Sequence, residues 1–70
     1  MSFNPGDVVE IKSSHSIFTL PHRVGIVGEI IEINNDGTYK TATITTGRDR
    51  ITASFLDIEL TDKPYHKSCH

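Results

Sequence analysis

Residues 23–37 read Arg-Val-Gly-Ile-Val-Gly-Glu-Ile-Ile-Glu-Ile-Asn-Asn-Asp-Gly and carry the strongest indication of the fold. Apolar residues occupy both parities of the predicted strand Arg23–Ile33, so both of its faces carry apolar side chains. Gly25 and Gly28 stand where the parity changes, and glycine inside a strand favours a bulge or a sharp bend. The pattern predicts a long, bent strand that serves both halves of a small barrel.

The stretch ends in a strong turn signal, Asn34 to Gly37. Asn and Asp-Gly tolerate positive φ, so these four residues predict a hairpin turn. The partner strand is predicted over Thr38–Thr46. It alternates a mildly apolar face, Lys40, Ala42 and Ile44, with a row of threonines on the other face.

The same alternation on either side of residues 23–46 predicts the rest of the sheet. Val9 and Ile11 share one face of the first strand, and Ile51, Ala53 and Phe55 mark the inward face of the fourth. The remaining elements are a first strand at 7–12, a turn at 46–49, a strand that begins at 51, a single 3₁₀ turn at 54–57 and a last strand at 58–60.

Composition supports this pattern. Of the 70 residues, 21 are Ile, Val or Thr and only five are Ala or Leu, which favours a pleated sheet over helices. A chain of this length forms one domain. We therefore predict an all-β, five-stranded, strongly bent antiparallel barrel over residues 3–61, with a short 3₁₀ turn before the last strand. Residues 62–70 lack periodicity and are predicted to form a flexible C-terminal tail.

Charge and cysteine content limit the function classes. The net charge is −2, the isoelectric point is near 6.0, and no basic cluster occurs beyond Arg48 and Arg50. This argues against nucleic acid as the partner without excluding it. The single cysteine, Cys69, rules out an intramolecular disulfide. No apolar run reaches 18 residues and the start lacks the apolar segment of a signal peptide, so a cytoplasmic protein with no membrane partner is expected.

Four pieces of the sequence together resemble the SH3-like barrel superfamily: Gly6 to Val9, Gly25 to Ile33, Asp36-Gly37 and Phe55 to Leu60. The resemblance covers residues 5 to 61 and implies the fold. Within the superfamily, Val9 to Ser14, Pro21-His22 and Gly25 to Ile30 are similar to the variable chain of ferredoxin–thioredoxin reductase. The outline is also similar to the photosystem I stromal SH3-like subunit and to KOW-type ribosomal modules, which are more basic.

The first loop holds the main candidate binding residues, His15, Ile17, Phe18, Leu20 and His22. Partner contacts commonly lie at this place in SH3-like barrels. Two interpretations stay open. Either Phe18 and Leu20 fold back and plug an open end of the barrel, or the loop presents an apolar patch flanked by two titratable histidines.

Arg48 and Arg50 are further candidates, because guanidinium groups suit carboxylates and phosphates. They flank Asp49 on a turn, so a solvated hairpin tip is the alternative. At the C-terminus, His66, Cys69 and His70 are the candidate ligands for a metal such as zinc. Ligands on a terminal segment alone bind weakly, so no metal site and no cofactor are predicted.

Catalysis finds little support in the sequence. Cys69 lies one residue from the end, and the serines near His15 are neighbours in sequence rather than an oriented triad. Type II dihydrofolate reductase shares the size and outline. Its active-site Gln and Tyr would fall at 51–54, where this chain has Ile-Thr-Ala-Ser. That activity is the remote alternative.

The sequence therefore predicts a non-catalytic accessory or adaptor protein, which binds a larger protein partner or a second copy of itself. The resemblance implies a ferredoxin-linked redox complex as one setting. The alternative is a KOW-like RNA- or ribosome-binding module. That alternative requires the basic residues to gather on one face, and they are Lys12, Arg23, Lys40, Arg48 and Arg50.

Overall fold

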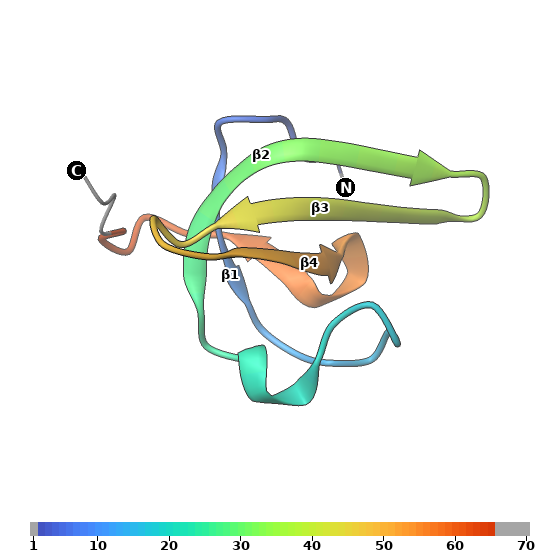
Figure 1. Cartoon of the computed structure of the whole chain (residues 1–70), viewed down its shortest axis with the longest axis horizontal. Coiled ribbons are helices and arrows are strands. Elements are labelled where there is room, and N and C mark those ends of the chain that lie inside the picture. Colours follow the sequence, from blue (N-terminus) through green and yellow to red (C-terminus); the bar gives the residue numbers. More distant parts are fainter. Residues whose placement is uncertain (1, 66–70) are drawn as a thin grey trace.

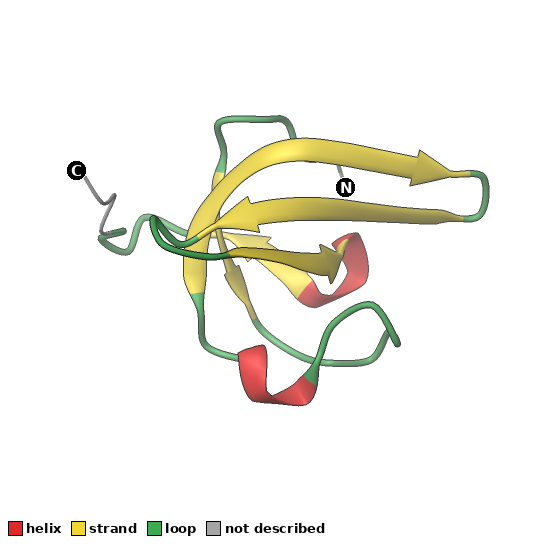
Figure 2. Ribbon diagram, viewed as in Figure 1, coloured by secondary structure: helices red, strands yellow, loops and turns green. Residues whose placement is uncertain are grey.

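The computed structural model describes residues 2–65, and at Asp36 it describes the backbone alone. The elements are β1 (Val8–Ile11), η1 (Pro21–Arg23), β2 (Val27–Asp36), β3 (Tyr39–Thr45), β4 (Arg50–Ser54), η2 (Phe55–Asp57) and β5 (Ile58–Leu60), where η marks a 3₁₀ turn. The five strands form one sheet in the order β4-β3-β2-β1-β5, and every pairing is antiparallel (Figures 1 and 2). The prediction of an all-β, five-stranded antiparallel fold is confirmed.

Strand β2 is the long, bent strand that links the two halves of the sheet. It pairs with β1 over Val27–Glu29 and with β3 over Glu29–Asp36, and Figure 1 shows it curving between these two partners. The register with β3 shifts between Ile30 and Glu32, which makes Ile31 the extra residue of a bulge. Gly25 and Gly28 predicted a bulge or a bend, and the register shift lies further along the strand, at Ile31.

Gly28 is required for close contact between strands. An added Cβ would lie 2.5 Å from the Thr45 carbonyl oxygen and 2.6 Å from Ile44 Cγ2. Both distances are far below van der Waals contact, and the first involves backbone, which cannot swing aside. Any other residue here would push β3 away from β2 at the bend.

The predicted start of this strand, Arg23, is wrong by four residues. Proline favours the first position of a helical turn, and Pro21 begins η1 there. The Ile26 N–H then bonds the Arg23 carbonyl oxygen at 3.1 Å, and Gly25 adopts a φ of +98°. The chain is therefore still turning at Arg23, and β2 begins at Val27.

The predicted end at Ile33 is also wrong, because the hairpin turn is tighter than four residues. Asn34, Asn35 and Asp36 continue the ladder, and Asp36 pairs with Tyr39. Gly37 and Thr38 alone make the turn. Gly37 has a φ of +66°, and glycine at the first central position is typical of a type II′ turn.

The core lies on the face that alternation predicted. Its buried apolar residues are Phe3, Val9, Ile11, Ile30, Ala42, Ile44, Ile51, Ala53 and Ile58. The ring of Phe55 packs edge-on against Phe3, with centroids 5.0 Å apart, and stays partly exposed. On the threonine face of β3, Thr41 is buried as well.

The predicted 3₁₀ turn before the last strand is confirmed. It spans Phe55–Asp57, and the Ser54 hydroxyl oxygen caps it by accepting a hydrogen bond from the Leu56 N–H at 3.2 Å. This turn places Asp57 within hydrogen-bond distance of the first loop, residues 13–16.

Candidate protein-binding site

One buried carboxylate accepts the hydrogen bonds that fix the first loop. Asp57 is 1% exposed, and its Oδ1 accepts hydrogen bonds from the Ser13 hydroxyl at 2.7 Å and the His15 N–H at 2.8 Å. Its Oδ2 accepts one from the Ser16 N–H at 3.0 Å. Burial by itself raises the pKa of this carboxyl, but the loop's hydrogen bonds outweigh burial and lower the pKa to about 2. Asp57 is therefore ionised at neutral pH and fixes the backbone of the loop.

Thr19 fixes the other end of the loop. It is 1% exposed, and its hydroxyl oxygen accepts a hydrogen bond from the Ser54 N–H at 2.9 Å while the hydroxyl helps to lower the pKa of Asp57. Its carbonyl oxygen accepts a bond from the Ser14 hydroxyl. We call this set of contacts around Asp57 and Thr19 the loop brace. The side chain that reaches the interior is thus Thr19, whereas Phe18 and Leu20, the residues of the plug interpretation, remain at the surface.

Four apolar side chains, on the braced loop and next to it, are exposed to solvent. Ile17 is 90% exposed, Leu56 on η2 is 82% exposed, and the Phe18 and Tyr39 rings are partly exposed. The two rings lie 5.5 Å apart between centroids, at 60°. We call Ile17, Phe18, Tyr39 and Leu56 the loop patch. It surrounds a hollow of about 330 Å³ that His15 also lines.

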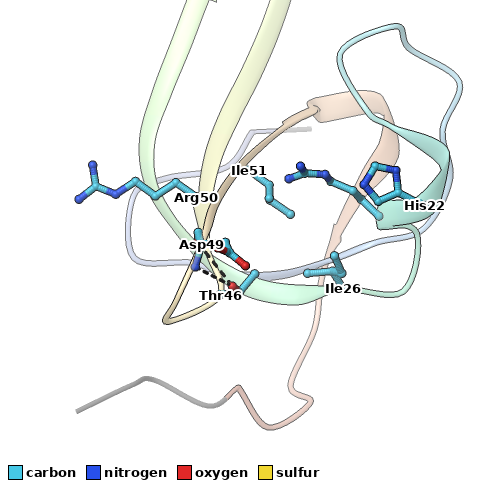
Figure 3. A pocket seen from close by; sticks show the side chains of 7 residues that line it. His22, Ile26, Thr46, Asp49, Arg50 and Ile51 are labelled. Carbon is cyan, nitrogen blue, oxygen red and sulfur yellow. Dashed lines mark hydrogen bonds between the residues drawn. The ribbon is translucent and has the colours of Figure 1, made fainter. Parts of the chain in front are cut away.

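Two further hollows share Arg23, Arg50 and Ile51, and the smaller of them adjoins the patch at Phe18. The larger, about 610 Å³, is also lined by His22, Ile26, Thr46 and Asp49 (Figure 3). The smaller, about 340 Å³, is also lined by Phe18, Leu20 and Thr52. We call this smaller one the arginine hollow. In Figure 3 the Arg50 side chain extends away from His22.

The structure thus brings six of the seven predicted binding residues to this series of hollows. His15, Ile17 and Phe18 line the first, Leu20 and Arg50 line the arginine hollow, and His22 lines the largest. The seventh, Arg48, is exposed on the turn between β3 and β4 and lines none of these three.

Sequence reasoning missed four residues of the site. Tyr39 and Leu56 were assigned to a strand and a 3₁₀ turn, and their part in the patch depends on contacts across the fold. Asp57 and Thr19 bond to partners 35 to 44 residues away. The local sign of a buried acceptor was the cluster of serine hydroxyls around His15, because hydroxyl groups need an acceptor when they are buried.

A second carboxylate is satisfied in a different way. Glu10 is largely buried although it lies on the face of β1 predicted to point outward. Its Oε1 lies 2.8 Å from Lys63 Nζ and 3.5 Å from Lys12 Nζ. The hydrogen bond from Lys63 lowers the pKa of Glu10 below its usual range, and Lys12 adds to the effect. Lys63, from the predicted tail, thus holds the chain after β5 against β1.

The predicted metal ligands His66, Cys69 and His70 lie outside the described residues. Within residues 2–65, no group of three or more His, Cys, Asp or Glu side chains is placed to hold a metal ion. In the same part of the chain, no helix is long and apolar enough to cross a membrane.

Comparisons with known proteins add no relative. The chain matches no protein-family model, and searches of the curated proteins and of the solved structures found no significant match.

Proposed function

We propose that this chain is a non-catalytic accessory protein that binds a larger protein partner through the loop patch. The observation that carries the proposal is a contiguous apolar surface, Ile17, Phe18, Tyr39 and Leu56, which the fold holds in solvent instead of burying. Exposed apolar side chains gathered around a hollow mark interaction surfaces more often than scattered ones do.

The loop brace supports this proposal. A loop with a 90% exposed isoleucine at its centre would ordinarily be mobile, yet three of its residues bond the buried Asp57 carboxylate. Fixing a loop before binding reduces the conformational entropy lost when the partner arrives. Covering Ile17 completely would contribute about 1.5–3 kcal/mol to binding.

We further propose that the sheet is an SH3-like barrel. The support is the strand order β4-β3-β2-β1-β5 and the bent β2, whose two ends pair with different strands. The resemblance to the variable chain of ferredoxin–thioredoxin reductase suggests a redox complex in the cytoplasm as the setting.

Charge placement favours a protein partner over RNA. The RNA-binding alternative needs the basic residues on one face. Lys12 is instead beside Glu10 on β1, and Lys40 lines a separate hollow next to Leu56. Arg23 and Arg50 do share a hollow, but Lys12 and Lys40 do not line it.

Site-specific photocrosslinking tests the proposal. A photoreactive phenylalanine analogue replaces Ile17 in one variant and Leu60 in another, and each is irradiated in extract of the native host. Leu60 is the control because it is also an exposed aliphatic residue, on β5. We expect one protein to crosslink from position 17 and not from position 60. The double variant I17S/L56S should lose the same protein in pull-downs, whereas L60S keeps it. Equal crosslinking from both positions contradicts the proposal, as does crosslinking to RNA.

A further inference from the structure

The arginine hollow adjoins the loop patch through a shared residue. Phe18 lines both the arginine hollow and the hollow of the patch. A partner that covers Ile17 and Tyr39 therefore meets Arg23 and Arg50 next. The contact surface combines apolar side chains with two arginine residues.

The two arginines of this hollow have no carboxylate partner within residues 2–65. Every ion pair found in that part of the chain joins a lysine, Lys12 or Lys63, to Glu10. The six residues that line the arginine hollow include no acidic one. Asp49 lines the neighbouring, larger hollow instead (Figure 3). Arg23 and Arg50 thus line a hollow without an acidic residue on a chain whose net charge is −2, and Figure 3 shows the Arg50 side chain extended away from His22.

We infer that the protein partner presents an acidic–apolar segment, which places a carboxylate between Arg23 and Arg50 and apolar side chains on Phe18 and Leu20. The inference rests on the proposed function and names its partner chemistry. Guanidinium groups bind carboxylates through paired, parallel hydrogen bonds. Arg50 is exposed and its long side chain can turn toward the hollow. The volume of about 340 Å³ is at the lower end of the range for binding pockets.

A carboxylate suits this site better than a nucleic-acid backbone. Single-stranded RNA needs a groove of several positive charges and aromatic rings free to stack with bases. Here two arginines line the hollow, which is fewer positive charges than such a groove needs, and the Phe18 ring already packs against Tyr39.

Three labelled peptides test the inference. Each has 12 residues and the same leucines, and the charged positions are all Glu, all Gln or all Lys. Fluorescence anisotropy at 50 mM salt should give the Glu peptide an affinity about tenfold above the Gln peptide, with the Lys peptide weakest. At 500 mM salt the advantage of the Glu peptide should shrink, because salt screens exposed charges. A labelled uridine oligonucleotide is the fourth probe.

Two single variants separate the site from general charge. R50Q should remove most of the Glu peptide's advantage, whereas R48Q, the same charge change outside the hollow, should leave it intact. Both positions are exposed, and circular dichroism checks that both variants fold. Equal binding of all three peptides, or equal effects of the two variants, overturns the inference. So does no binding by any peptide, or tighter binding of the oligonucleotide. The crosslinking from position 17 reports separately on the loop patch.

Discussion

Two carboxylates are withdrawn from solvent among the side chains that the structure describes, and they are stabilised by opposite means. Asp57 accepts hydrogen bonds from neutral groups, the hydroxyls and backbone N–H groups of the first loop. Glu10 is bound by two lysine side chains that are themselves about half exposed. Neutral donors act at short range and resist screening by salt, whereas exposed ion pairs contribute little and are screened. The first loop, which carries Ile17 and Phe18 of the loop patch, is therefore firmly fixed. The segment after β5 is fixed weakly.

Removing the first carboxylate should have the largest effect. D57A leaves the Ser13 hydroxyl and the N–H groups of His15 and Ser16 without their acceptor. We expect the free energy of unfolding to fall by about 3 kcal/mol, as measured by urea denaturation. D49A, which truncates an exposed aspartate, is the control and should change stability by less than about 0.5 kcal/mol. Similar losses in both variants would contradict the role assigned to Asp57.

Acid should break the loop brace without a mutation. The pKa of Asp57 is lowered to about 2 from an ordinary value of 3.8, so the stability that it contributes is complete above pH 3.8. That contribution is lost as the pH falls through about 2. Thermal unfolding between pH 5 and 2 should therefore show a steeper fall in Tm for the wild type than for D57N. Parallel curves would show that Asp57 is not the group responsible.

Thr19 should have an intermediate effect. T19V keeps the volume but removes the hydroxyl that accepts the Ser54 N–H at a buried position. A buried donor without a partner costs about 1–3 kcal/mol, and we expect a loss in that range. T52V is the matched control, because Thr52 is exposed on the same strand. Hydrogen exchange should show faster exchange at the Ser54 amide in T19V and no change there in T52V.

The smallest effect is expected at the ion pair. K63Q removes the closer of the two cations beside Glu10, and the loss of stability should be below that of T19V because Lys63 is more than half exposed. The difference from wild type should decrease further at 0.5 M sodium chloride. For D57A the difference should be the same at both salt concentrations. A salt-independent effect of K63Q would remove the contrast between the two carboxylates.

Strand alternation was sufficient to predict the core. Val9 with Ile11, Ala42 with Ile44, and Ile51 with Ala53 are buried as their parity indicates. This succeeds because a strand with one buried face repeats every two residues. Turn signals located the hairpin but not its length, since Asn34 to Asp36 tolerate a turn and can also continue a ladder.

Alternation failed to predict burial where a residue distant in sequence covers the outward face of a strand. Glu10 has outward parity, yet Lys63 reaches it from beyond β5. The same limit applies to the site. The apolar loop was recognised from the sequence, and its exposed position was one of the two interpretations left open. Asp57 was not, because its partners lie 41 to 44 positions earlier and no local pattern joins them.

That separation also has a consequence for the order of events in folding. A contact between residues 41 to 44 positions apart closes a long loop, which is entropically costly until intervening strands have paired. The β2–β3 hairpin, by contrast, closes across two residues. The loop brace is therefore expected to form after the folding transition state. Stabilisation added at that stage slows unfolding and leaves the folding rate nearly unchanged. The brace then acts mainly by prolonging the lifetime of the folded molecule.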